Sequence, residues 1–279
     1  MEALEHQIQE QMERRALAAV AVHTLGNIRV WRPGEEGRAS IPIGPKEWGR
    51  DISLQLFQFF VTARQQRALH KEQIIDRIWG ESVGDRTGQQ HFKVALHGLN
   101  KALETERKSR SEARYVLRQG HSYQLQLDDF WIDADALEHF IALGNQALPH
   151  RPDLARRAYQ AAIELHHGVY LPNRLYEDWS SDERERLQVL TLGATISLGE
   201  LLLRENPLES IRLAQQALLI DKAWEDAYRI QMEAYFLKGN RPMAIKTYQQ
   251  CQRVLDEEFG IEPLPETRRL LERIRGVKA

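Results

Sequence analysis

A set of polar side chains in residues 87–104 has the composition and spacing to contact the edges of DNA bases. On an α-helix of 3.6 residues per turn, the apolar residues of this segment share one side and the polar set falls about 120° away. The polar set, with one valine beside it and one asparagine at its edge, is Gln90, Lys93, Val94, His97, Asn100 and Lys101. Glutamine and asparagine amides pair with adenine, lysine donates to guanine or phosphate, and valine contacts the thymine methyl. The pattern favours a helix that enters the major groove, although a solvated amphipathic helix explains this segment taken alone.

A cluster of cations follows the same segment. The candidates for contacts to phosphate are Arg107, Lys108, Arg110, Arg114, Arg118 and His121. Cations beside a base-contacting helix neutralise phosphates, which supplies most of the affinity for DNA and makes it depend on salt. A solvated loop with scattered charges is the alternative, so the order of the surrounding elements has to decide.

Short strands are predicted on both sides of the helices. Residues 19–43 alternate between apolar and polar positions in runs divided by glycine and proline clusters, which predicts a small antiparallel sheet. Residues 115–127 predict a hairpin whose turn contains Gln119 and Gly120. Residues 1–18 form an N-terminal extension with few apolar positions, which predicts a helix that faces solvent.

Three helices are predicted between the two sets of strands. An apolar stripe over residues 54–61 predicts the first, and residues 74–79 predict a shorter one that ends at Gly80. Thr87 and Gln90 match a capping box at the start of the third. The order of sheet, three helices and hairpin predicts an α+β winged helix over residues 19–127.

The chain beyond residue 128 shows an internal repeat of helices. Asn206, Ile211, Gln215 and Gln216 recur 34 positions later as Asn240, Ile245, Gln249 and Gln250. A period of 34 residues is that of tetratricopeptide repeats, in which each helix pair buries its apolar face against its neighbours. Residues 166–186 are interpreted as an insertion between repeat-like helices. We therefore expect a mainly α chain, with an all-α tetratricopeptide-like helical domain over residues 128–279.

The composition is consistent with two domains that bind different kinds of partner. A length of 279 residues suits a small domain followed by a larger one. Residues 46–126 carry 14 Lys and Arg against 9 Asp and Glu, whereas residues 127–279 carry 19 against 25. A net charge of +5 followed by −6 is typical of a polyanion-binding module joined to a protein-binding one, although surfaces drift by several charges without such meaning.

Catalytic and membrane functions find little support in the sequence. His166 and His167 are adjacent, so on a helix they point about 100° apart and do not share a metal. No glycine-rich phosphate loop or paired-cysteine site is present, and the single cysteine, Cys251, matches an alanine of the preceding repeat. We expect no catalytic residue, metal or cofactor. The longest apolar run is too short to span a membrane, so we expect no membrane partner and a cytoplasmic protein.

These features resemble a known family of bacterial regulators. Residues 19–127 resemble an OmpR-like winged helix, and residues 129–276 resemble a bacterial transcriptional activator domain, the pair found in SARP-type regulators. The stretches that carry the resemblance are residues 115–125, 131–140, 155–165, 167–171, Trp179, 183–187, 235–239, Arg241, Ala244 and 248–263. Relatives usually have a second glycine at the wing, where this chain has Ser122.

The resemblance implies a DNA-binding transcriptional regulator, expected to be an activator that recruits RNA polymerase. The helix over residues 87–104 would enter the major groove and the hairpin would reach the adjacent minor groove or backbone. The loop expected to contact RNA polymerase is Glu81, Ser82, Val83, Gly84, Asp85 and Arg86. No receiver domain fits in residues 1–18, so control by aspartyl phosphorylation within this chain is not expected.

Two further hypotheses concern partners. The first is that the protein binds tandem direct repeats of double-stranded DNA head-to-tail and self-associates there, because two copies read a longer site than one. The second is an alternative function, in which the chain is a tetratricopeptide-like adaptor whose winged helix binds a protein instead of DNA.

Overall fold

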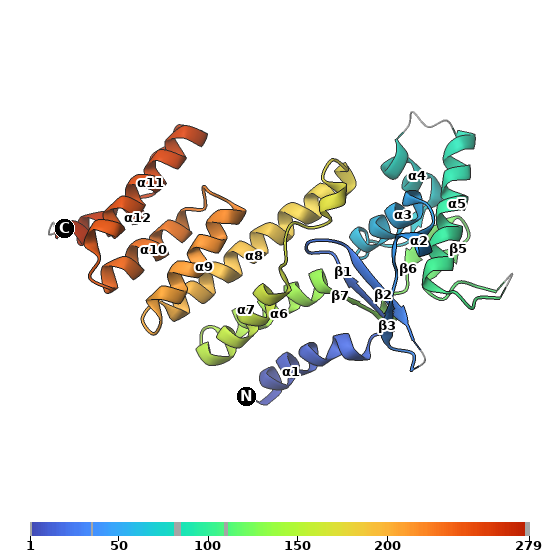
Figure 1. Cartoon of the computed structure of the whole chain (residues 1–279), viewed down its shortest axis with the longest axis horizontal. Helices are drawn as coiled ribbons and strands as arrows, with labels where there is room; N and C mark the ends of the chain where they lie inside the picture. The colour runs from blue at the N-terminus through green and yellow to red at the C-terminus, as the bar shows by residue number, and fades with distance from the viewer. Residues whose placement is uncertain (1, 35, 81–84, 109–110, 277–279) are drawn as a thin grey trace. The chain divides into compact units, whose positions relative to one another are not determined.

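A computed structural model describes residues 2–34, 36–80, 85–108 and 111–276 (Figure 1). The contacts divide the chain into two compact units. We call residues 9–136 with 165–187 the sheet unit, and residues 1–8, 137–164 and 188–279 the helical unit. The helices α1 (Glu2–Leu17), α6 (Asp133–Ala147), α7 (Pro152–Leu165) and α8 (Ser181–Leu202) contribute residues to both.

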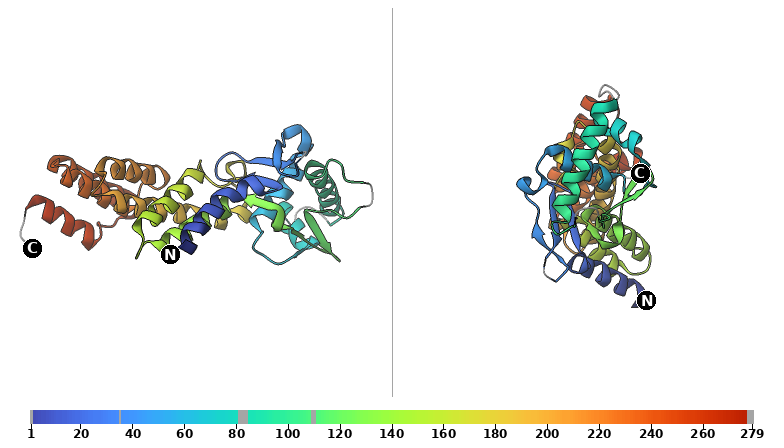
Figure 2. Two further views of the ribbon diagram at one scale, coloured as in Figure 1. Left: turned by 90° about the horizontal axis from the view of Figure 1, so that it is seen from below. Right: turned by 90° about the vertical axis from the view of Figure 1, so that its right-hand side faces the viewer.

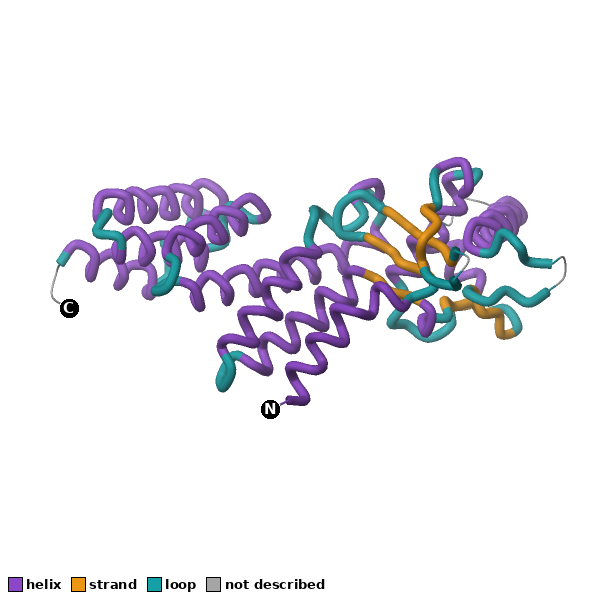
Figure 3. Tube along the Cα trace, turned by 60° about the horizontal axis from the view of Figure 1, so that its bottom comes forward, coloured by secondary structure: helices purple, strands orange, loops and turns teal. Residues whose placement is uncertain are grey.

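The sheet unit holds the strands of the structure, shown in orange in Figure 3. Its elements in chain order are β1 (Val20–His23), β2 (Arg29–Pro33), β3 (Ala39–Pro42), α2 (Pro45–Trp48), α3 (Asp51–Thr62), β4 (Leu69–His70), α4 (Lys71–Trp79), α5 (Asp85–Leu103), β5 (Val116–Gln119), β6 (Ser122–Leu125), η1 (Leu127–Asp129), β7 (Phe130–Ile132), η2 (Pro172–Arg174) and η3 (Asp178–Ser180). The succession of strands, helices and hairpin confirms the predicted α+β winged helix.

The first sheet has the strand order β3-β2-β1-β7. β1 pairs with β2 antiparallel, as predicted, and with β7 parallel, which the sequence did not predict. β1 therefore lies between two strands, and all four of its residues are buried. A strand of three residues such as β7 is too short to show an alternating pattern, which is why the segment was expected to belong to the helical half.

The helices of the winged helix are more tightly packed than one apolar stripe on each of them predicts. α3 buries Leu56, Phe57, Phe59, Phe60 and Val61, so it is covered on more than one side. It also approaches α5 closely, because a Cβ atom on Gly98 would lie 2.1 Å from Oγ of Ser53. α4 ends at Gly80, as predicted, where φ is +74°.

The start of α5 corrects one prediction. The helix begins at Asp85, so Thr87 lies within the first turn and does not form the predicted capping box with Gln90. The capping box that the structure does contain is on α4, where the side chain of His70 accepts from the amide of Glu72 and Gln73 accepts from the amide of His70.

The hairpin β5–β6 is paired over Val116 to Gln119 with Ser122 to Leu125. Because Gln119 pairs with Ser122, the turn consists of Gly120 and His121, one residue later than predicted. Gly120 has φ +62°, a conformation that favours glycine. Ser122 lies in regular strand, so the serine in place of the usual second glycine leaves the hairpin intact.

The helical unit contains the predicted repeat. The helices that lie wholly in it are α9 (Pro207–Ile220), α10 (Glu225–Leu237), α11 (Arg241–Phe259) and α12 (Pro265–Arg275), and all of α7 but Leu165 belongs to it as well. Asn206 and Asn240, the residues 34 positions apart, cap α9 and α11 by accepting from the amides of Glu209 and Met243. Cys251 is fully buried in this unit, in the small core position expected for it, and burial raises the pKa of its thiol to about 12.

Residues 165–187 belong to the sheet unit, although the sequence suggested an insertion between repeat-like helices. The last part of that stretch is the start of α8, and the preceding residues form η2 and η3. The expected division of the chain into domains at residue 127 remains a prediction, because compact units and autonomously folding domains are different properties. α1 confirms the predicted N-terminal helix, but it buries Ile8 completely instead of facing solvent throughout.

Candidate nucleic-acid interface

One side of α5 packs against the rest of the sheet unit, and the other side is exposed to solvent. Phe92 and Leu99 are fully buried, and the ring of Phe92 packs edge-on against that of Tyr123 at 4.9 Å, which ties the helix to β6. In the views of Figures 1 and 2, α5 lies beside the β5–β6 hairpin. The predicted polar residues that are exposed are Gln90, Lys93, His97 and Lys101, and Val94 beside them is half-buried. The structure thus brings these side chains to one solvent-facing side of a firmly packed helix.

Asn100 lies elsewhere. Its side chain is buried, with 8% of the residue exposed, so it is not on the open face with Lys93 and Lys101. Its Oδ1 atom has no hydrogen-bond partner among the described residues. The helical wheel put Asn100 at the edge of the polar set, and at an edge position it is the neighbouring elements that decide burial, which the wheel does not include.

The predicted phosphate-binding cations differ in how free they are. Arg107 donates to the carbonyl of Ser111 at 2.6 and 3.1 Å, and Arg118 donates to the carbonyl of Gly120 at 2.8 Å. Arg114 is paired with Asp129 at 2.8 Å, and this hydrogen bond raises the pKa of its guanidinium. Lys108 and His121 are exposed. Arg110 lies outside the described residues. Among the predicted cations that the structure describes, Arg114 is therefore the one whose charge is already paired with a carboxylate.

Hollows flank α5 on two sides. One of about 420 Å³ lies between α5 and the hairpin, where Leu96, Asn100, Arg107 and Arg118 contribute to its wall. Another, of about 320 Å³, lies between α5, α2 and β2 and includes Lys46 and Arg50, which were not among the predicted contacts. Both are basic residues next to the start of the first predicted helix, so their charge is visible in the sequence. Nothing in the sequence places them beside α5.

The loop expected to contact RNA polymerase is only partly described. Glu81, Ser82, Val83 and Gly84 lie outside the described residues. Asp85 is the first residue of α5, and Arg86 is exposed in its first turn. The role of this loop remains a proposal.

A network of polar contacts joins residues 166–186 to α3. The guanidinium of Arg174 donates to both carboxylate oxygens of Asp51, at 2.6 and 3.0 Å, and its Nε donates to Oε1 of Gln58 at 2.8 Å. The Nε2 of Gln58 in turn donates to Asn173 at 3.0 Å. Trp179 packs edge-on against Phe59 with ring centroids 5.7 Å apart. These contacts explain why α3 is buried on more sides than one stripe predicts.

A second ion-pair centre lies at the other end of α3. Arg64 is 2.6 Å from Asp135 and 2.9 Å from Glu183, while its own side chain is almost completely buried. Burial acts to lower the pKa of Arg64, but the two carboxylates raise it above its usual value. The hydroxyl groups of Tyr170 and Thr62 lie 2.9 Å apart nearby. The guanidinium therefore joins α6, α8 and α3 through charge.

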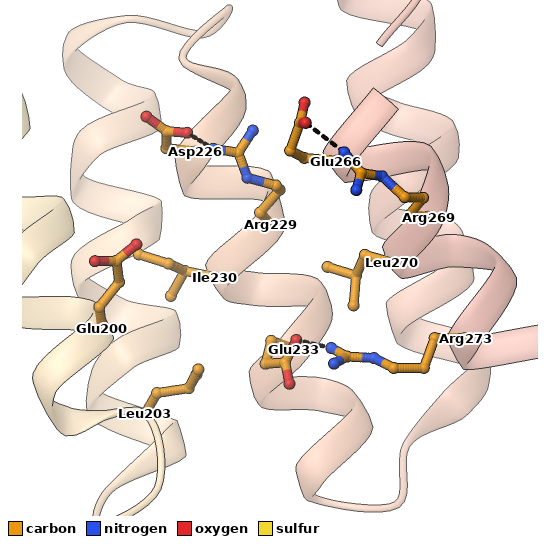
Figure 4. Close-up of a pocket in the computed structure, with 10 residues that line it drawn as sticks. All are labelled: Glu200, Leu203, Asp226, Arg229, Ile230, Glu233, Glu266, Arg269, Leu270 and Arg273. Carbon is orange, nitrogen blue, oxygen red and sulfur yellow. Dashed lines mark hydrogen bonds and ion pairs between the residues drawn. The ribbon is translucent and has the colours of Figure 1, made fainter. Parts of the chain in front are cut away.

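The helical unit has a groove of its own, of about 420 Å³, between α8, α10 and α12 (Figure 4). Leu203, Ile230 and Leu270 supply its apolar part. The arginines that line it are paired with carboxylates, Arg229 with Asp226, Arg269 with Glu266 and Arg273 with Glu233. In the described part of the chain no group of three or more His, Cys, Asp and Glu side chains is positioned to hold a metal ion. Among the described helices, none combines the length with the apolar composition that a membrane span requires.

Comparison with known families identifies the helical half of the chain. The model of the bacterial transcriptional activator domain matches residues 132–275, a little over half of the chain. The chain belongs to the bacterial transcriptional activator domain family. The resemblance to SARP-type regulators predicted from the sequence is thereby confirmed, and the family is one of transcription regulators.

A solved structure extends the match across both halves of this bacterial transcriptional activator domain protein. It is similar to EmbR of Mycobacterium tuberculosis in complex with a low-affinity phosphopeptide, with a TM-score of 0.76 at 18% identity over 94% of this chain. At that identity the likeness shows the fold, and this chain spans 66% of the EmbR chain. No match was found among curated protein sequences.

Proposed function

We propose that this protein is a sequence-specific DNA-binding transcriptional regulator. The observation that carries the proposal is the exposed side of α5, where Gln90, Lys93, His97 and Lys101 face solvent on a helix whose other side is packed. A helix of this kind fits the major groove, and amide and lysine side chains are the groups that pair with purine edges there.

The proposal includes activation through RNA polymerase. Membership in the bacterial transcriptional activator domain family supports activation over repression. The segment before α5, which ends at Asp85 and Arg86, is the candidate contact with polymerase. Binding to tandem direct repeats, with contacts between neighbouring copies, would lengthen the site that is read.

The adaptor alternative rests on a different observation, the groove between α8, α10 and α12. Its apolar residues and paired charges resemble the lining of sites that accept a partner segment. On this alternative the sheet unit binds a protein and the exposed side of α5 is a protein-binding surface. The two functions differ in what they predict for duplex DNA.

Selection of bound fragments from a pool of random double-stranded DNA tests the proposal. The expected result is enrichment of one short motif, and direct repetition of that motif at a fixed spacing would support tandem binding. Failure of folded protein to retain any fragment above background would favour the adaptor alternative, and retention of fragments without a shared motif would contradict sequence-specific binding.

A further inference from the structure

The hollow beside α2 is the most cationic part of the α5 surroundings. It is lined by four cationic side chains, Arg32, Lys46, Arg50 and Lys101, against the single carboxylate of Glu47. Among the described residues Lys46, Arg50 and Lys101 have no carboxylate partner, and Lys46 and Arg50 are exposed. A concave surface with several unpaired cations attracts an anion more strongly than a flat one does.

Arg32 gives this hollow a fixed wall. Its guanidinium donates to the carbonyl of Ala102 at 3.0 Å, near the C-terminal end of α5. That contact ties β2 to the helix, so a charge bound in the hollow is held at a set distance from the side of α5 that carries His97 and Lys101.

The hollow on the hairpin side is less favourable for an anion. Its lining has two arginines, Arg107 and Arg118, against Glu112, and both arginines already donate to backbone carbonyls. The neighbouring Arg114 is neutralised by Asp129. Of these two hollows, the one beside α2 therefore has the larger excess of positive charge.

Asp51 is the acidic residue next to Arg50 in the chain, and it is engaged elsewhere. Both of its carboxylate oxygens accept from Arg174. A carboxylate held by one guanidinium in two hydrogen bonds is a poor competitor for a second arginine. The contact from residues 166–186 therefore leaves Arg50 available to an external anion.

We infer that Lys46 and Arg50 each bind a backbone phosphate of duplex DNA on the flank of α5 away from the hairpin. The inference rests on the proposed function and adds to it a second point of attachment. Phosphate contacts fix the register of a helix in the groove without reading sequence. On this inference Lys46 and Arg50 contact the DNA backbone on one side of α5, and the hairpin contacts it on the other side. The two sugar-phosphate backbones that border the groove then hold the helix in position.

Binding of a short random-sequence DNA duplex, measured by fluorescence anisotropy over a series of salt concentrations, tests the inference. Each phosphate contact contributes about 0.9 to the slope of log affinity against log salt. For Lys46→Ala with Arg50→Ala we expect the slope to fall by about 2 and low-salt affinity to fall on the order of tenfold. Lys46→Arg with Arg50→Lys keeps both charges and should keep the slope.

The matched control is Arg14→Ala with Arg38→Ala. Both control residues are exposed, belong to the sheet unit and line neither hollow, so the variant loses the same charge at other positions. A slope equal to that of this control would overturn the inference while leaving DNA binding intact. Absence of salt-dependent binding by the wild-type chain would overturn the proposed function as well.

Discussion

Arg174 and Asp51 are 123 positions apart in the chain and form a two-point ion pair, with N–H···O distances of 2.6 and 3.0 Å. The pair is asymmetric, since the Arg174 side chain is 9% exposed and that of Asp51 is 68% exposed. The buried partner also holds Gln58 through its Nε. One residue of the family-matched region thus orders the start and the middle of α3 in the winged helix.

Removing Arg174 should destabilise the sheet unit. Arg174→Ala leaves Gln58 without its donor and Asp51 without its partner, and we expect a loss of about 2–4 kcal/mol in the free energy of unfolding. Denaturant titration measures this. Arg212→Ala, which breaks an exposed pair with Glu209, is the control and should cost under about 1 kcal/mol. Equal effects of the two changes would contradict the role given to Arg174.

Close packing of α3 on α5 makes Gly98 sensitive to substitution. A methyl group there would meet Oγ of Ser53 at 2.1 Å, so Gly98→Ala should destabilise the fold by about 1–3 kcal/mol. Gly193→Ala is the matched control, because α8 has nothing within 4 Å of that Cβ position. Alanine favours helix over glycine by up to about 1 kcal/mol, so the control should be neutral or stabilising in the same thermal or denaturant measurement.

The stability of the sheet unit should fall on acidification because of His23. Burial lowers the pKa of this imidazole from 6.5 to about 4, and the charges of Arg15 and Arg29 and the nearby His167 add to the effect. Between these values the unfolded chain takes up a proton that the folded chain excludes, so the stabilisation present above pH 6.5 is lost as pH falls toward 4. The expected loss from pH 7 to pH 5 is about 2 kcal/mol.

His23→Phe isolates this contribution. The ring of His23 lies 5.1 Å from both Trp31 and Trp131, so an apolar ring keeps the packing while removing the proton site. Asp133 lies 3.7 Å from His23, and burial raises the pKa of its carboxyl group, so its protonation changes the stability in the opposite direction. Asp133 is present in the wild-type protein and in His23→Phe alike. Urea unfolding should show a smaller pH dependence for His23→Phe, and an unchanged one would assign the acid sensitivity to other groups.

The sequence was most informative where periodicity decides the structure. The stripes of α3, α4 and α5 and the 34-residue spacing of Asn206 and Asn240 predicted helices that the structure contains. These patterns depend on which residues share one face of a helix, and that is a local property of the chain.

The sequence was least informative where contacts cross long distances. The parallel pairing of β7 with β1 and the packing of residues 166–186 on α3 join segments about a hundred residues apart, which no local pattern reports. The same limit applies at the site. Asn100 faced the polar side on a wheel but is buried in the structure, and Lys46 and Arg50 reach the surroundings of α5 through tertiary packing.

The central claim is that the exposed side of α5 contacts duplex DNA, and equilibrium binding to the site recovered by selection tests it most directly. Lys93→Ala with Lys101→Ala should weaken binding at least tenfold and reduce its salt dependence, since each contact to guanine or phosphate carries about 1–3 kcal/mol or about 0.9 of slope. Gln90→Ala should relax base preference and leave the slope unchanged. Wild-type affinity and slope in a folded Lys93→Ala, Lys101→Ala protein would contradict the account.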